Sequence, residues 1–287
     1  MRVAIVGLGG VGGYLAAMFA KSGCDVVGFA RGVYLEAIQK NGITIVEDET
    51  QWQTPLNAVN VNAAEGYFDV IFFCVKSYDL NDAYAKMAKN IDENSILLSF
   101  SNGVDNAQRL KKLSNAVVLE GCVYILSHIE KAGVIRKKGK VFAAVFGGDN
   151  ANAVQKVAAL FEKAQLRYKT PSDITTAIWK KYIFIAAFAT LTSYYDTNIG
   201  AIYEHHYDEA KALLEEIAAF AKENEGVNID DEVQKALDTA AKVPYDSSTS
   251  MRLDFQNSKK VELESLCGYV KKPLMLKFYK ALKERVL

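Results

Sequence analysis

The stretch VAIVGLGGVGG (residues 3–13) decides the fold of the first half of the chain. Gly7, Gly9 and Gly12 form a G-x-G-x-x-G pattern between an apolar β-branched run and an amphipathic stretch that begins at Tyr14. In dinucleotide-binding sheets the first glycine makes a tight turn, the second lets the backbone approach a pyrophosphate, and the third lets helix and strand pack closely. A helix N-terminus adds NH groups and a positive dipole. We therefore predict a dinucleotide-binding loop, with a glycine turn that binds no ligand as the alternative.

The residues predicted to contact the dinucleotide in this loop are Gly7, Leu8, Gly9, Gly10, Val11 and Gly12. Around them, β-branched runs alternate with helical stretches over about 150 residues, which predicts a parallel sheet covered by helices. The expected strands are 3–7, 25–30, 68–75, 95–100, 116–121 and 166–169, and the expected helices are 14–23, 34–42, 81–91 and 151–164. Residues 123–148 are expected to form an antiparallel meander of three short strands at the sheet edge.

After Pro171 the sequence is almost continuously helical. The expected helices there are 172–191, 207–226, 230–243 and 259–270. A length of 287 residues favours two domains over one. We predict an α/β fold, with an N-terminal Rossmann domain built on a doubly wound parallel sheet (1–168) followed by an all-α C-terminal domain (169–287). The boundary is expected near residues 166–170.

Composition excludes several classes of protein. The formal net charge is zero, and a nucleic-acid-binding protein would normally carry a basic excess. The sequence becomes glycine-rich within seven residues and holds no run of about 18 uncharged apolar residues, so we expect neither a signal peptide nor a membrane partner. The cysteines are interpreted as buried thiols of a reducing, cytoplasmic protein without a metal site. These cysteines are Cys24, Cys74, Cys122 and Cys267.

The end of the second expected strand selects between two cofactors. NAD-selective domains usually place an acidic residue there, to hold the ribose 2′-hydroxyl. Arg31 stands at this position instead. Because a guanidinium can bind a 2′-phosphate through two hydrogen bonds, the sequence predicts NADP(H). A solvated surface arginine is the alternative interpretation.

These features together resemble the ketopantoate reductase (2-dehydropantoate 2-reductase) family, over nearly the whole chain. The resemblance rests on GLGGVGG (7–13), CVKSYD (74–79), SNGVDN (101–106), IWKKY (178–182), TNIGAI (197–202), TSMRLD (249–254) and VELESLCG (261–268). It implies reduction of a branched 2-keto acid by NADPH, in a cleft between two domains.

Residue by residue, the resemblance implies that Lys181 is the catalytic lysine. Its ammonium suits the reaction because a developing alkoxide needs a cation or an acid beside it. Lys76 is expected to meet the cofactor ribose or the substrate, and Asn102 to orient the nicotinamide ribose or the keto acid. Plain solvation of Lys181 and an ordinary Asn-Gly turn at Asn102 are the alternatives.

The resemblance further implies substrate contacts by Ser250 and Glu262, for which an N-cap serine and a solvated glutamate are the alternatives. Asn198 aligns with a substrate-binding asparagine of the family to within one residue. Another family asparagine corresponds to Cys267 here.

Two substrate-binding asparagines of the family correspond to Ile185 and Ala189 in this chain. They lie four and eight residues after Lys181, hence on the same helical face. An unpaired buried hydroxyl costs about 1–3 kcal/mol, so this face favours a more apolar acid unless nearby side chains compensate. Thr192, Ser193 and Asn198 are the candidates for such compensation.

Three functions follow from these observations. The first is NADPH-dependent reduction of 2-dehydropantoate to pantoate, a step of pantothenate biosynthesis. The second keeps hydride transfer but uses a more apolar keto acid, and the third is a non-catalytic NADP-binding sensor. Retention of Lys181 argues against the sensor. The amphipathic stretch 208–224 could supply a homodimer surface.

Overall fold

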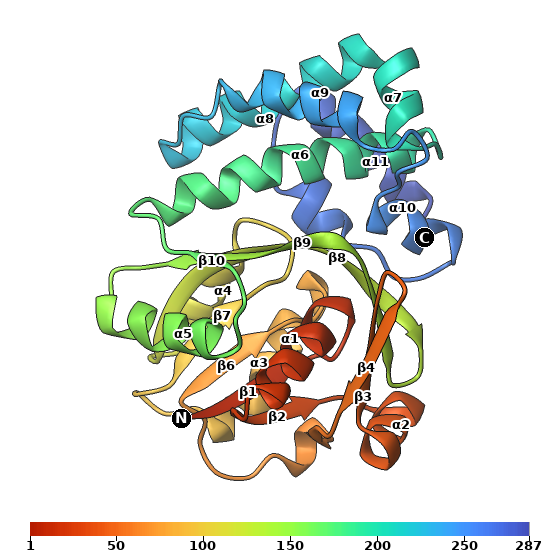
Figure 1. Cartoon of the computed structure of the whole chain (residues 1–287). Coiled ribbons are helices and arrows are strands. Elements are labelled where there is room, and N and C mark those ends of the chain that lie inside the picture. Colours follow the sequence, from red (N-terminus) through yellow and green to blue (C-terminus); the bar gives the residue numbers. More distant parts are fainter. Residues whose placement is uncertain (287) are drawn as a thin grey trace. The chain divides into compact units, whose positions relative to one another are not determined.

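A computed structural model describes residues 1–286. The chain divides into two compact units (Figure 1). The first unit contains Met1–Ser101 and Asp105–Ile174, and the second contains Asn102–Val104 and the chain from Thr175 onward. The division expected near residues 166–170 thus lies a few residues later, after Ile174, and a three-residue loop groups with the helical unit.

The first unit is built on a ten-stranded sheet. Its strands are β1 (Arg2–Val6), β2 (Asp25–Phe29), β3 (Ile43–Glu47), β4 (Thr50–Thr54), β5 (Asn57–Val59), β6 (Val70–Phe73), β7 (Ile96–Ser99), β8 (Val117–Lys131), β9 (Val134–Gly147) and β10 (Tyr168–Lys169). Six of them pair in parallel in the order β5-β2-β1-β6-β7-β8. Counted along the chain this order is 3-2-1-4-5-6, the order of doubly wound dinucleotide-binding sheets, and the predicted fold class is confirmed.

Helices cover both faces of this parallel region (Figure 1). α1 (Gly10–Lys21), α2 (Gly32–Asn41) and α5 (Ala151–Lys163) pack on one face, and α3 (Leu80–Met87) and α4 (Asn106–Leu113) on the other. Side chains of the central strands alternate between the two cores, so the interior positions of these strands are mostly apolar. In β1, Val3 and Ile5 enter one core while Ala4 and Val6 enter the other.

The sheet edge differs from the prediction. The expected strand 116–121 and the following meander form two long antiparallel strands, β8 and β9, with irregularities in register at Ile125/Ser127 and Ile129/Lys131. These irregularities interrupt the alternation of side chains, which is why the sequence suggested several short strands. The hairpin β3–β4 and the strand β5 were not predicted. β4 is an edge strand with a polar sequence, TQWQT, and therefore shows no apolar alternation.

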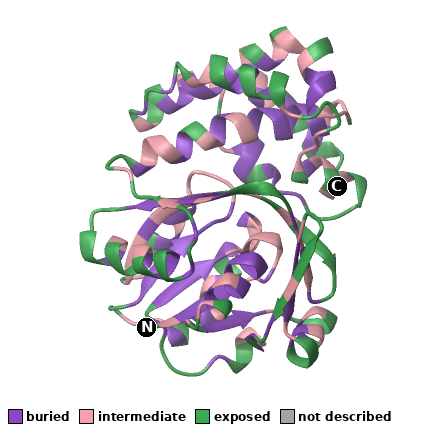
Figure 2. Cartoon of the chain, in the orientation of Figure 1, coloured by how far each residue is buried: buried purple, intermediate pink, exposed green. Residues whose placement is uncertain are grey.

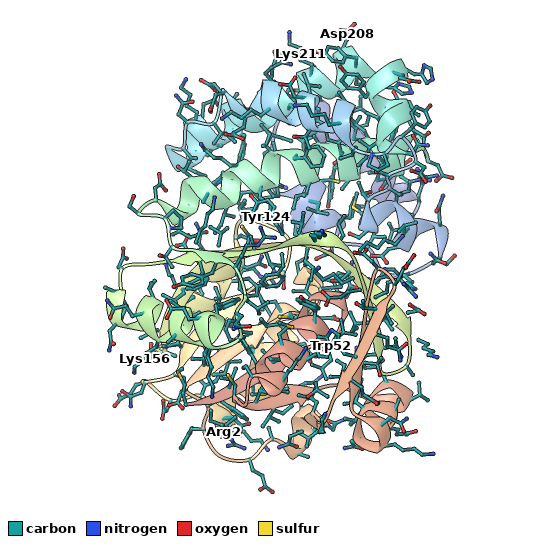
Figure 3. The ribbon with its side chains drawn as sticks, viewed as in Figure 1. Arg2, Trp52, Tyr124, Lys156, Asp208 and Lys211 are labelled. Atoms are coloured by element: carbon teal, nitrogen blue, oxygen red, sulfur yellow. The ribbon has the colours of Figure 1, made fainter. Side chains whose placement is uncertain are left out.

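The second unit is helical. Its helices are α6 (Ile174–Tyr194, whose first residue belongs to the first unit), α7 (Ile199–His205), α8 (Tyr207–Glu225), α9 (Glu232–Lys242), α10 (Ser250–Gln256) and α11 (Pro273–Glu284). α6 is largely buried, as Figure 2 shows, and Trp179, Ile183 and Phe188 lie in the core of this unit. α8 buries one face, while Asp208 and Lys211 point outward from its first turns (Figure 3).

α6 is long and apolar enough to cross a membrane by length and composition alone. It contains Lys180 and Lys181, so it holds no run of about 18 uncharged residues, as the sequence predicted. Within its most apolar window of 18 residues, 61% of the residues are buried inside the protein. A helix that is apolar on all sides is also typical of a protein core.

The predicted helix 259–270 is wrong. Only a five-residue π-helical turn forms there, at Glu264–Gly268. The carbonyl oxygens of Ser265 and Leu266 accept hydrogen bonds from the Tyr182 hydroxyl of α6. A side chain from another element therefore binds carbonyls that a regular helix would bind within itself.

Candidate active site

The glycine loop follows β1 directly. Gly7 has a φ of +95°, and its NH donates to the carbonyl of Phe29 at 3.2 Å. A Cβ at this position would lie 2.8 Å from a methyl carbon of Val75. Only glycine adopts this turn without strain, so the tight turn predicted at Gly7 is confirmed.

Close packing explains two other glycines of the loop. A Cβ on Gly12 would lie 2.0 Å from the carbonyl oxygen of Gly7, which confirms the predicted contact of helix and strand. A Cβ on Gly10 would lie 2.4 Å from the carbonyl oxygen of Ser127, so Gly10 allows β8 to approach α1. Leu8 is buried and packs against Gly28, so only its backbone is open to a ligand.

Gly9 differs from its neighbours because a Cβ there would meet no protein atom within 4 Å. Gly9 is the N-cap residue of α1, and no side chain caps the first NH groups of that helix. Protein packing therefore does not require glycine at this position. An uncapped helix N-terminus beside open space fits the pyrophosphate of a dinucleotide.

Lys76 and Arg31 lie at the same edge of the sheet as this loop. β2, β1 and β6 are neighbours and parallel, so their carboxyl ends meet at the point where the strand order reverses. Lys76 follows β6 and is half-buried, at the start of a 3₁₀ turn (Ser77–Asp79). Arg31 follows β2 and is exposed, and within residues 1–286 its guanidinium has no hydrogen bond or ion pair. This edge is where open α/β sheets bind their ligands.

In the second unit, three predicted site residues come together. The Lys181 ammonium donates to the Asn102 side-chain oxygen at 3.3 Å, and the Asn102 amide nitrogen donates to a Glu262 carboxylate oxygen at 3.4 Å. Asn102 thus joins a cation to an anion with the acceptor and donor of a single amide. Glu262 is only 4% exposed, which contradicts its interpretation as a solvated glutamate.

Asn198 and Ser250 are not linked to this Lys–Asn–Glu chain. The Asn198 side-chain oxygen accepts from the NH of Ala201 at 2.8 Å and so caps α7. Ser250 is exposed at the first position of α10, and the N-cap of that helix is Thr249, so the N-cap interpretation of Ser250 is wrong. The Thr249 hydroxyl forms a hydrogen bond with the Thr192 hydroxyl at 2.7 Å. Thr192 lies eleven residues after Lys181 on α6, a distance of about 16 Å along the helix axis.

The face of α6 between these points is apolar. Ile185 is half-buried, whereas Ala189 is 3% exposed and leaves little surface for a ligand. The Thr192 hydroxyl also donates to the carbonyl of Phe188 at 2.6 Å, and Ser193 is 1% exposed. Neither hydroxyl is placed to replace the missing asparagines.

Cys267 has a packing role. Its sulfur lies 2.9 Å from the hydroxyl of Thr190, and both residues are fully buried. Burial raises the pKa of the Cys267 thiol to about 12. In the first unit, burial also raises the pKa of the Cys74 thiol, which follows β6, to about 12. Both are neutral thiols at physiological pH. Across residues 1–286 no group of three or more His, Cys, Asp or Glu side chains is arranged to hold a metal ion.

Two family models match the chain. The model described as Ketopantoate reductase PanE/ApbA matches residues 3–149, and its C-terminal counterpart matches residues 173–272. The uncharacterized oxidoreductase YkpB of Bacillus subtilis (strain 168) is 29% identical over 280 residues, which cover 94% of this chain and 91% of that protein.

Solved structures are similar over the full length. The 2-dehydropantoate 2-reductase of Porphyromonas gingivalis W83 is 31% identical, with a TM-score of 0.85 over 99% of both chains. D-mandelate dehydrogenase in complex with NADH and anilino(oxo)acetate has a TM-score of 0.90 over 100% of this chain and 98% of its own. Its identity is 16%, so this second likeness shows the fold alone.

Proposed function

This chain belongs to the ketopantoate reductase family of NAD(P)-dependent oxidoreductases, and on that premise we propose that it reduces a 2-keto acid to a 2-hydroxy acid with NADPH. The first candidate substrate is 2-dehydropantoate, whose product is pantoate. The observation that carries the proposal is the Lys181–Asn102–Glu262 chain, in which a half-buried ammonium is hydrogen-bonded through an amide to a buried carboxylate.

The first unit fits the cofactor. The NH groups at the start of α1 and the open position at Gly9 would hold the pyrophosphate. Arg31, exposed after β2, would hold a 2′-phosphate, and Lys76 after β6 would meet the ribose. When bound, NADPH supplies the hydride. The chemistry left to the protein is to orient the keto acid and to stabilise the charge that develops on its oxygen.

Lys181 would perform that second task. Its ammonium can donate a hydrogen bond and a proton to the developing alkoxide of the substrate. The Asn102 oxygen, 3.3 Å away, restricts where the ammonium lies. Glu262 lies on the other side of the Asn102 amide and accepts from its nitrogen at 3.4 Å, which fixes how the amide oxygen faces Lys181. Removing one such electrostatic stabiliser typically lowers kcat by about 10²–10³.

Ile185 favours a second candidate substrate, a 2-keto acid with an apolar side chain. Ile185 is half-buried on the Lys181 face of α6, and the hydroxyls of Thr192 and Ser193 are buried. A substrate hydroxyl placed against Ile185 would have no partner from this part of the helix. The fold is compatible with an apolar acid, because D-mandelate dehydrogenase holds anilino(oxo)acetate in a chain of the same fold.

Two measurements test the proposal. In a fluorescence titration we expect NADPH to bind at least about tenfold more tightly than NADH, a difference of about 1.4 kcal/mol, and Arg31→Ala to remove most of that preference. In a screen of 2-keto acids followed at the NADPH absorbance, we expect oxidation with 2-dehydropantoate or with an apolar analogue. Tight NADPH binding without oxidation by any keto acid would favour the sensor instead.

A further inference from the structure

Tyr182 follows Lys181 on α6 and was given no role by the sequence. It is 1% exposed, and its hydroxyl lies 3.1 Å from the carbonyl oxygen of Ser265 and 3.0 Å from that of Leu266. A phenol has a single proton, so the two carbonyls share it, and both distances are at the long end of the range for such bonds. Tyr182 therefore binds two successive backbone groups of one turn.

This turn is connected to Glu262. The NH of Leu266 donates to the carbonyl of Glu262 at 3.1 Å, and the hydroxyl of Ser265 donates to the same oxygen at 3.2 Å. Both residues that accept from Tyr182 thus hold the backbone of Glu262.

The ring of Tyr182 is itself held in place. Trp179 packs edge-on against it, with ring centroids 5.2 Å apart and an interplanar angle of 78°. Trp179 is also 1% exposed, so the phenol has no room to rotate away. A second hydrogen bond joins α6 to the same turn, between the Thr190 hydroxyl and the Cys267 sulfur. It does not involve the carbonyls of Ser265 and Leu266.

We propose that Tyr182 is a positioning residue, which fixes the Glu262 carboxylate relative to Lys181 by holding the turn at Glu264–Gly268. The proposal rests on the proposed function, since it assigns Tyr182 a part in the same site. The contact it protects is a long one, 3.4 Å between Asn102 and Glu262, and a small shift of the Glu262 backbone would break it. Tyr182 acts through Glu262 and does not touch the substrate.

The test compares Tyr182→Phe with Tyr195→Phe. The control residue, Tyr195, lies directly after the last residue of α6. Its hydroxyl donates to a Glu209 carboxylate oxygen at 2.5 Å, and the control variant removes that hydrogen bond. We expect Tyr182→Phe to lower kcat about tenfold while the Kd for NADPH changes less than about twofold, and Tyr195→Phe to leave both within about twofold. A kcat within twofold of the parent for Tyr182→Phe, alongside a large loss in Glu262→Gln, would overturn the proposal.

A double-mutant cycle separates positioning from general structural damage. If Tyr182 acts through Glu262, Tyr182→Phe should lower kcat less than about twofold further in the Glu262→Gln background. Losses that multiply would show an independent role and contradict the proposal. If neither Lys181→Ala nor Glu262→Gln lowers kcat, it is the proposed function that fails.

A crystal structure of Tyr182→Phe provides a test without any substrate. We expect the turn at Glu264–Gly268 to change its hydrogen bonding and the Glu262 carboxylate to move away from Asn102. An unchanged turn with Glu262 in place would overturn the proposal whatever the kinetics.

Discussion

The first and second halves of α6 carry polar side chains that are used in different ways. In the first half, Lys181 and Tyr182 bind partners from distant segments, Asn102 and the turn after Glu262. Near its end, Thr192 bonds the carbonyl of Phe188 and the cap residue Thr249, so its hydroxyl is engaged in stabilising the fold. On one helix, the Lys181 side chain thus lies in the candidate site, whereas the Thr192 hydroxyl is used within the fold.

This difference gives a criterion for choosing among candidate residues. A side chain whose donor or acceptor already satisfies a helix terminus contributes stability, typically about 1 kcal/mol, and has less left to offer a ligand. A charged side chain held by another side chain can still stabilise charge that develops on a substrate. On the proposed function, this criterion favours Lys181 over Thr192 as the residue beside the reacting atoms.

The largest expected effect is on Lys181. Lys181→Ala should lower kcat by at least about 10², because the ammonium stabilises the transition state more than the ground state. Lys180→Ala is the matched control, since Lys180 is exposed and pairs with Glu232 at 3.3 Å. Steady-state kinetics with saturating NADPH would measure both. If Lys181→Ala kept over half of the parent kcat, the catalytic assignment of Lys181 would be wrong, and Lys76 would be the next candidate.

Ile185 tests the apolar face of α6 that lies between Lys181 and Thr192. A deoxy analogue of 2-dehydropantoate, with methyl in place of hydroxymethyl, should react at least as well as 2-dehydropantoate itself. Ile185→Asn should shift the kcat/KM ratio toward 2-dehydropantoate by about tenfold, because the amide can pair with the hydroxyl. Ala189→Asn is the comparison, since Ala189 is buried and the larger side chain should lower Tm without that shift.

A hundredfold preference of the parent for 2-dehydropantoate over the deoxy analogue would contradict this account of the face. Another part of the protein would then bind the hydroxyl, and the apolar substrate would be excluded.

Asn198→Ala tests whether the Asn198 side chain acts as a helix cap and not as a substrate contact. Asn198→Ala should destabilise the protein by about 1 kcal/mol, because the NH of Ala201 loses its acceptor, with kcat/KM within about twofold. Asn150→Ala is matched to it, since Asn150 caps α5 through the NH of Ala153 at 3.0 Å. Urea unfolding and steady-state kinetics would compare the two variants. A tenfold loss of kcat/KM confined to Asn198→Ala would return Asn198 to the substrate site.

The smallest effect concerns Asp196, just beyond the end of α6. A hydrogen bond from Arg252 holds the pKa of the Asp196 carboxyl below its usual value. Its contribution to stability is therefore present above the unfolded-state pKa of about 3.9 and is lost as pH falls through the lower folded value. Because Asp196 is 55% exposed, we expect this contribution to be under about 1 kcal/mol.

Unfolding of Asp196→Asn by urea at pH 7 and near pH 3 would measure that contribution. The variant should be less stable than the parent at pH 7, with a smaller difference near pH 3. A difference that grows on acidification would contradict the sign of the shift.

The sequence was sufficient where the determinants are local. The glycines of the loop follow one another within six residues, and the roles predicted for Gly7 and Gly12 concern the turn and the helix that follows it. The close approach of Ser127 to Gly10 involves a distant strand and was not predicted. The alternating runs also predicted five of the six strands in the parallel order, all but β5. β4 was missed because an edge strand with a polar sequence lacks the periodicity on which such predictions depend.

The sequence by itself determined the fold class, the loop at residues 7–12 and, through the family resemblance, the identity of Lys181, Asn102 and Glu262. Only the tertiary structure decided that these three side chains form one chain across sequence separations of 79 and 160 residues. It also decided that Asn198 is a helix cap and that Tyr182 holds a turn. The reason is physical: backbone preferences and side-chain periodicity depend on residues adjacent in the chain, whereas contacts between elements depend on how their faces pack.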